Sequence, residues 1–221
     1  MLPKIIIHNS ISLDGSLTNF MPNMELHYRI AGSYKPDAHL IGSNTIKTGV
    51  ELYESGVPKE EKTDFEKPER DKNLPYWVIP DTGGTLKGLL HTCRRFEFCR
   101  DVIVLVSNQT SASYIRHLKE RNYDYHITGK KHIDLKISLK LLSAKYKVKK
   151  ILTDTGRILS SLLLNQGLAN EISLLVHPLI VGTTSYNVFS SVTKNLKLKL
   201  MKREIPEKEY IWLIYKIIKG D

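Results

Sequence analysis

The sequence predicts a three-layer α/β/α fold, in which helices cover both faces of a mostly parallel sheet that ends in an antiparallel C-terminal strand. Short apolar runs typical of buried strands, such as 102–106, alternate with segments of helical periodicity. Several of these runs end in a polar or glycine-containing turn, and the aromatic-rich segment 209–218 alternates as an antiparallel strand does. We expect a single domain over residues 1–221, because a chain of 221 residues with 41% hydrophobic content can bury one large core.

The N-terminal half contains the first expected elements. Residues 4–8 form a β-branched run after Pro3, which predicts a central strand that ends towards the Asp14-Gly15 turn. Pro22 opens a probable helix that runs to Gly32. Residues 39–41 predict a second strand with a short helix directly after it. Residues 51–75 are charged and rich in proline, so we expect a mobile surface excursion there.

The C-terminal half continues the alternation. Further strands are expected at 76–79, 102–106, 125–127, 151–152, 172–176 and 209–218. Helical spacing of apolar residues predicts helices at 111–121, 137–146 and 158–167, the last of them closed by Gly167. Residues 196–200 alternate lysine with leucine, as a strand with one solvent-exposed face does.

Composition limits the class of protein. The net charge of +10 suits a nucleic acid or a small phosphorylated ligand. The basic residues are spread along the chain without an aromatic-lined stripe, which favours the small ligand over nucleic acid. Cys93 and Cys99 fit no zinc-binding pattern, so we expect no metal and two unpaired thiols in a reducing cytoplasm. No stretch has the length of a membrane span, and no signal-peptide layout precedes the first strand, so we expect a cytoplasmic protein.

Two turns resemble phosphate-binding sites. In the segment 150–183, an apolar run meets the turn Asp154-Thr155-Gly156-Arg157 and a helix follows at Ile158. A helix N-terminus carries unpaired N–H groups and a positive dipole end, glycine permits close approach, and arginine adds donors. An ordinary strand–helix turn explains the same residues equally well. The turn Gly42-Ser43-Asn44-Thr45 follows another strand in the same way, so a ligand carrying phosphate that bridges both turns is the favoured interpretation.

Two isolated side chains, His8 and Glu25, are candidate acids or bases. His8 lies within an expected strand, where a packed and hydrogen-bonded histidine is the favoured interpretation. Glu25 stands in the first turn of an expected helix, where a carboxylate usually complements the helix dipole.

Taken together, the motifs resemble the reductase domain of riboflavin biosynthesis. The similarity rests on Leu13-Asp14-Gly15 after a strand, on Gly42-x-x-Thr45 and Asp154-x-Gly156, and on Leu159, Leu163, Gly167-Leu168, Glu171-Ile172, Pro178 and Gly182. The resemblance implies a dihydrofolate-reductase-like fold and hydride transfer from NADPH to C1′ of a phosphorylated ribosylamino-pyrimidine. It also implies a homodimer. Because no deaminase domain accompanies these residues, we expect a stand-alone reductase of the archaeal or fungal kind.

The resemblance also assigns roles to residues. Ser10 and Asp14 would act in catalysis and, with Gly15, would border the nicotinamide and the substrate. The cofactor phosphates and adenosine would be met by Gly42, Ser43, Asn44, Thr45, Ser107, Asn108, Asp154, Thr155, Gly156, Arg157 and Ile158.

The chain departs from the family pattern at three places. Ser16 replaces the lysine of Asp-Gly-Lys, Thr155-Gly156-Arg157 replaces a glycine triplet, and residues 48–53 replace Asp-Asp-Pro. The substrate is therefore less determined than the fold. Two alternatives stay open: a dihydrofolate or pterin reductase with Glu25 as its acid, and a basic nucleic-acid-binding module on a reductase-like scaffold.

Overall fold

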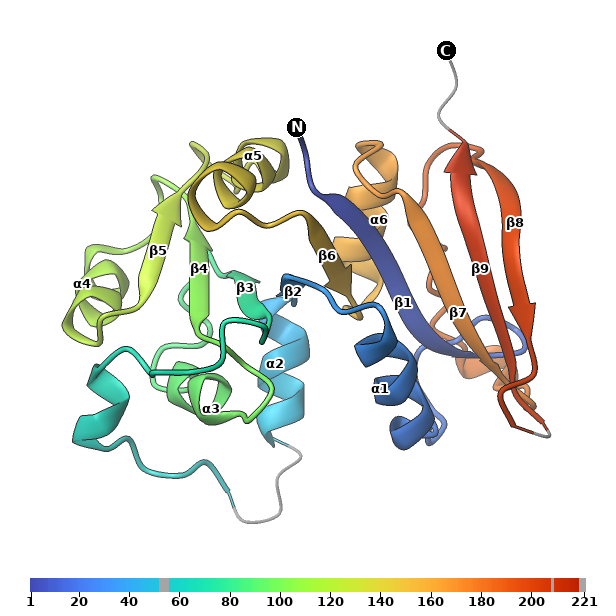
Figure 1. Cartoon of the computed structure of the whole chain (residues 1–221), viewed down its shortest axis with the longest axis horizontal. Coiled ribbons are helices and arrows are strands. Elements are labelled where there is room, and N and C mark those ends of the chain that lie inside the picture. The colour runs from blue at the N-terminus through green and yellow to red at the C-terminus, as the bar shows by residue number, and fades with distance from the viewer. Residues whose placement is uncertain (52–55, 208, 219–221) are drawn as a thin grey trace. The chain divides into compact units, whose positions relative to one another are not determined.

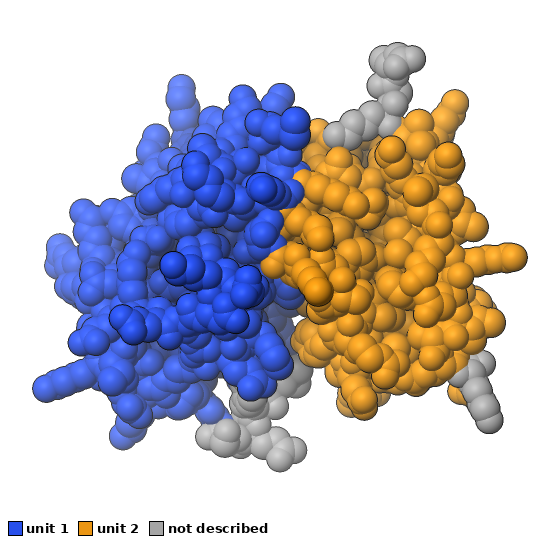
Figure 2. All heavy atoms as spheres, viewed as in Figure 1, with its two compact units in different colours: residues 1–3, 37–149 blue, residues 4–36, 150–221 orange. Residues whose placement is uncertain are grey.

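The computed structural model describes residues 1–51, 56–207 and 209–218. The chain divides into two compact units, which Figure 2 colours separately. Unit 1 comprises Met1–Pro3 and Asp37–Lys149, and unit 2 comprises Lys4–Pro36 and Lys150–Asp221. The expected single domain stays a prediction. Among the described residues, no helix combines the length and apolar character needed to cross a membrane.

The sheet of unit 1 is parallel. Its strands lie in the order β2-β3-β4-β5 (Figure 1), with bounds Ala38–Leu40, Tyr76–Pro80, Val102–Val106 and Asp124–Ile127. Val78 pairs with Ile103, and Val104 pairs with Tyr125, which sets the register. All five residues of β4 are buried, as the continuous apolar run predicted.

Three helices connect these strands, and a fourth follows β5. They are α2 (Ser43–Glu51), α3 (Leu90–Arg95), α4 (Ala112–Glu120) and α5 (Leu135–Tyr146). The first three pack against one buried cluster that includes Ile46, Leu90, Leu118 and Val104. Helix α3 is not predicted from the sequence, because its six residues end in two arginines and show no apolar periodicity.

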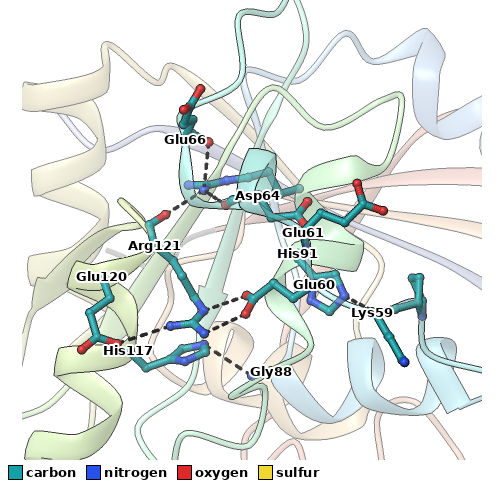
Figure 3. Close-up of polar contacts among 12 residues, drawn as sticks. Lys59, Glu60, Glu61, Asp64, Glu66, Gly88, His91, His117, Glu120 and Arg121 are labelled. Atoms are coloured by element: carbon teal, nitrogen blue, oxygen red, sulfur yellow. Dashed lines mark hydrogen bonds and ion pairs between the residues drawn. The ribbon is translucent and has the colours of Figure 1, made fainter.

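The segment 56–75 is tied to α3 and α4 by a polar network (Figure 3). The two carboxylate oxygens of Glu60 each accept a hydrogen bond from Arg121 at 2.7 Å. Asp64 is buried and accepts from Arg95, while Arg94 donates to the Asp64 carbonyl at 2.8 Å. Hydrogen bonds thus hold the described part of the predicted surface excursion in place. Residues 52–55 of this excursion lie outside the described residues.

The sheet of unit 2 is mixed. Its strands lie in the order β6-β1-β7-β9-β8, with bounds Lys150–Thr153, Lys4–Ser12, Glu171–His177, Ile211–Ile218 and Lys197–Glu204. β1 is parallel to β6 and β7, whereas β9 is antiparallel to β7 and β8. The predicted class, mostly parallel with antiparallel strands at the C-terminus, is confirmed.

Helices lie on both faces of this sheet, with α1 (Met24–Ser33) on one and α6 (Arg157–Asn165) on the other (Figure 1). Leu26 and Ile30 of α1 pack against Leu175 and Trp212. α1 begins at the N-cap Asn23, whose side chain accepts from the Leu26 N–H at 3.0 Å. Pro22 therefore precedes the helix instead of starting it.

Strand β1 is longer than predicted. The apolar run ends at Ile7, but pairing with β7 continues to Ser12. Asn9 and Ser12 are buried despite their polarity, because both side chains find hydrogen-bond partners within unit 2. The extension matters because it carries polar side chains to the carboxyl end of the strand.

Candidate functional site

In unit 2, three parallel strands end at the same edge of the sheet. β1, β6 and β7 end at Ser12, Thr153 and His177, and their carboxyl ends are the usual place for a ligand in such sheets. The predicted turn at residues 154–157 follows β6 and begins at this edge. The Asn9 side chain donates to the Thr155 carbonyl at 3.2 Å, so β1 fixes the conformation of that turn.

The N-terminus of α6 is open. Gly156 is its N-cap, with φ −67° and ψ 176°, and as a glycine it makes no side-chain capping hydrogen bond. A Cβ placed on Gly156 would find no atom of the described chain within 4 Å. Uncapped N–H groups, the positive end of the dipole and free space in front of a glycine are what a phosphate needs.

Arg157 lies beside this helix start, where a neighbouring loop holds it. Its guanidinium stacks over the Tyr186 ring at 4.0 Å and donates to the Ser190 hydroxyl at 2.9 Å. The Arg157 Nε is buried with no hydrogen-bond partner in the described parts of the chain. The loop thus fixes the predicted donor, Arg157, in position, and the Nε–H of this arginine stays without a partner among the described residues.

The turn at residues 13–16, which follows β1, is locked to residues 179–188. The Asp14 carboxylate accepts from the Val181 and Gly182 N–H groups at 3.2 and 2.9 Å, and from the Ser12 hydroxyl at 2.5 Å. These hydrogen bonds, led by that of Ser12, lower the pKa of Asp14 to about 2. Asp14 is therefore a carboxylate at neutral pH, suited to holding the loop and unsuited to donating a proton.

Gly15 is required by geometry at this turn. Its φ is +84°, in the left-handed region, and a Cβ there would come within 2.5 Å of the Asn187 amide nitrogen. Ser16 is fully buried, and its hydroxyl accepts from the Tyr186 N–H at 2.8 Å. The serine that replaces the expected lysine thus has a structural partner, and no room is left there for a long charged side chain.

Ser10 meets a residue that the sequence analysis did not single out. Its hydroxyl lies 3.0 Å from Nδ1 of His27 on α1. Nε2 of His27 lies 3.7 Å from an oxygen of Asp154, and the ring is 6% exposed. Unit 2 therefore aligns a hydroxyl, an imidazole and a carboxylate. The sequence signal that His27 faces the sheet is the apolar periodicity of α1, whose residues Leu26, Ile30 and Ala31 are buried.

The other two candidates behave as their favoured interpretations predicted. His8 is fully buried, with Nδ1 hydrogen-bonded to the Ser173 hydroxyl at 2.9 Å, so it is a packed histidine. Glu25 is exposed in the first turn of α1, where its charge complements the helix dipole.

The remaining predicted residues belong to unit 1. Gly42 precedes α2, which begins at Ser43 and includes Asn44 and Thr45. Ser107 and Asn108 follow β4, on the strand edge that also carries the end of β2. Ser107 is buried, and its hydroxyl donates to the Lys131 carbonyl and accepts from the Gln109 N–H, whereas Asn108 is exposed. Of this pair, Asn108 is the one free to meet a ligand with its side chain.

Comparison with known proteins identifies the family. The model of the RibD C-terminal domain matches residues 3–210. The chain belongs to the RibD C-terminal domain family. A search of curated proteins finds no match. Membership of this family supports classification of the chain as an oxidoreductase.

Solved structures share this fold at low sequence identity. The riboflavin biosynthesis reductase of Saccharomyces cerevisiae matches with TM-score 0.71 and 17% identity, over 98% of this chain and 90% of that one. A pyrimidine reductase-like protein of Corynebacterium diphtheriae matches with TM-score 0.70 and 19% identity, over 99% and 93%. RibD of Acinetobacter baumannii matches with TM-score 0.69 and 18% identity, over 99% of this chain and 59% of that one.

Proposed function

We propose that this RibD C-terminal domain protein is an NADPH-dependent reductase that acts on a phosphorylated ribosylamino-pyrimidine in riboflavin biosynthesis. The observation that carries the proposal is the uncapped, open N-terminus of α6 at Gly156, in a chain of a reductase family. When bound, the coenzyme supplies a hydride to C1′ of the substrate. The protein would bind the coenzyme and the substrate, orient them, and hold or move protons at the site.

Coenzyme contacts would come from the starts of two helices. In unit 2, the backbone N–H groups from Thr155 to Ile158 would meet phosphate oxygens at the positive end of α6. In unit 1, the start of α2 at 42–45 would serve in the same way, and Asn108 would lie on the adenosine side. The donor set fits a phosphate-bearing ligand, because backbone amides and a fixed arginine are what bind such groups.

Titration of NADPH and NADH into the purified protein, followed by nicotinamide fluorescence, tests this assignment. In Gly156→Asp a carboxylate replaces free space, and like-charge repulsion of about 3 kcal/mol should weaken NADPH binding by about 100-fold. Gly156→Ala should fold normally and bind more weakly than wild type, because its methyl group occupies the space of a phosphate. Gln166→Glu, which adds the same charge at the exposed other end of α6, should bind as wild type does. Wild-type protein that binds neither nucleotide would refute the proposal.

We also propose a homodimer that forms through one face of the β7-β9-β8 sheet. Side chains of directly paired residues share a face, which puts Leu200 beside Tyr215 and Leu198 beside Ile217. Trp212 points to the other face, where it packs on α1. Leu200 is 47% exposed and Ile211 44%, so an apolar strip faces outwards, and a second copy of the chain would bury it.

Sedimentation velocity tests the dimer. Leu200→Glu should shift the protein towards the monomer, whereas Lys199→Glu, on the opposite face of the same exposed strand, should leave the dimer intact. A wild-type monomer at micromolar concentration would contradict this part of the proposal. A cytoplasmic location is supported by the two unpaired, buried thiols, which are typical of reducing compartments.

A further inference from the structure

Ser10, His27 and Asp154 form a chain of polar contacts: the Ser10 hydroxyl lies within hydrogen-bond distance of His27 Nδ1, and an Asp154 carboxylate oxygen lies 3.7 Å from Nε2. The negative charge of Asp154 favours a hydrogen on Nε2, the imidazole nitrogen that faces it. Nδ1 of the neutral ring is then an acceptor, and the Ser10 hydroxyl donates to it. A second proton on Nδ1 reverses this last bond. The Ser10 hydroxyl hydrogen then turns away from the imidazole and becomes available to a ligand.

A neighbouring histidine is held neutral next to this chain. The rings of His8 and His27 stack with centroids 4.5 Å apart. Burial, followed by repulsion from His27, lowers the pKa of His8 to about 3. The hydroxyl of Ser173 lies 2.9 Å from His8 Nδ1 and accepts from Trp212 Nε1 at the same distance.

Among the described residues of unit 2, Tyr28 and His177 are two further titratable groups near His27. Tyr28, on the same helix, approaches the ring edge-on at 5.1 Å between centroids. His177 of β7 accepts from the Asn23 N–H through Nε2, and burial is the main cause that lowers its pKa. Of the three buried histidines described in unit 2, which are His8, His27 and His177, His27 is the one with both a carboxylate and a hydroxyl beside its ring.

We propose that the Ser10–His27–Asp154 chain delivers the proton that the substrate ring oxygen needs when its C1′–O bond opens. This inference rests on the proposed function. A new C1′–H bond forms with the two electrons of the hydride, and the electron pair of the broken C1′–O bond goes to the ring oxygen. That oxygen takes the hydroxyl proton of Ser10, and Ser10 takes the Nδ1 proton of His27. Solvent then returns one proton to His27, so the reaction consumes one proton per turnover.

The proposal gives each residue a distinct role. Ser10 touches the substrate and is the catalytic residue. His27 acts through Ser10, and Asp154 orients the ring and stabilises its charged form, so both are positioning residues. The exposed Glu25 on the same helix takes no part.

One test requires no substrate. In protein with ¹⁵N-labelled histidine, the ring nitrogen shifts of His27, assigned by their loss in His27→Asn, report which nitrogen carries the hydrogen. The proposal predicts a neutral form protonated on Nε2, and a changed Nδ1 shift in Ser10→Ala. A neutral form protonated on Nδ1 would overturn it.

The second test is kinetic, in single turnovers with saturating NADPH and the ribosylamino-pyrimidine phosphate. His27→Asn keeps an amide near the position of Nδ1 but cannot relay a proton, and should slow hydride transfer by about 10²- to 10⁴-fold. Ser10→Ala should cost about the same, and the double variant no more than the slower single variant. The wild-type solvent deuterium isotope effect should vanish in both, while NADPH affinity and Tm stay within error. Glu25→Gln should match wild type throughout.

The outcomes separate this inference from the proposed function. If wild-type protein neither binds NADPH nor turns over the substrate, this result refutes the proposed function and, with it, the proposed proton path. Active wild-type protein whose His27→Asn variant transfers hydride within threefold of it, with the isotope effect intact, overturns the proton path alone. Multiplicative losses in the double variant would also overturn it, because they would show that Ser10 and His27 act independently.

Discussion

Replacing Gly15 by alanine perturbs the turn at residues 13–16 in two separable ways. Gly15 has φ +84°, and an added Cβ would lie 2.5 Å from the Asn187 amide nitrogen. The left-handed backbone costs a non-glycine residue about 1–2 kcal/mol. Forcing extra atoms into a packed site adds about 1–3 kcal/mol, because Asn187 must then give up its hydrogen bond to the Asp14 carbonyl. Gly15→Ala should therefore lower the free energy of unfolding by about 2–5 kcal/mol.

Gly182 provides the matched control. Its φ is +78°, but a Cβ there would find no described atom within 4 Å, so Gly182→Ala isolates the backbone cost of about 1–2 kcal/mol. The free energies come from urea unfolding followed by circular dichroism. In the double variant Gly15→Ala/Asn187→Ala the steric part should vanish, which appears as non-additivity of about 1–3 kcal/mol. Equal destabilisation by Gly15→Ala and Gly182→Ala would refute this reasoning.

Three further outcomes follow from the structure. The folded-state pKa of Asp14 is about 2, below its ordinary 3.8. The stabilisation that Asp14 contributes is therefore complete above pH 4 and fades as pH falls towards 2. The free energy of unfolding, measured against pH, should fall in this range in wild type, and this contribution should be absent in Asp14→Asn. Arg94 is 3% exposed and donates to Asp101, so Arg94→Ala should cost about 3–5 kcal/mol in urea unfolding, because a buried carboxylate loses its partner; a loss below 1 kcal/mol would contradict it. Burial raises the pKa of Cys93 to about 12, and Cys99 is also buried, so both thiols should react with a disulfide reagent only at the rate of unfolding.

The strands and most helices could be predicted from sequence because their signal is local. Buried parallel strands such as β4 are continuous apolar runs, and the turn after β6 combines glycine with small polar residues before a periodic helix. Helix α3 could not be predicted, because it is stabilised by the hydrogen bonds of Arg94 to residues far away in the sequence.

The candidate site was only partly predictable for the same reason. The open helix start at Gly156 is a local property, and the resemblance to a known family supplied Ser10 and Asp14. The partnership of Ser10, His27 and Asp154 joins a strand, a helix and a distant turn, and no spacing within the sequence encodes it. The partners of Asp14 could not be predicted either. Its carboxylate accepts hydrogen bonds from the backbone N–H groups of Val181 and Gly182, which lie far away in the sequence.

The most direct test of the central claim is to follow the hydride itself. The protein would be incubated with NADPH deuterated at the transferable position of C4 and with the ribosylamino-pyrimidine phosphate, and the product analysed by mass spectrometry and NMR. The account predicts an opened ribityl chain with deuterium at C1′, formed in step with coenzyme oxidation and lost in Gly156→Asp. Coenzyme that stays reduced, with unchanged substrate in the presence of folded wild-type protein, would contradict the assignment of this reaction.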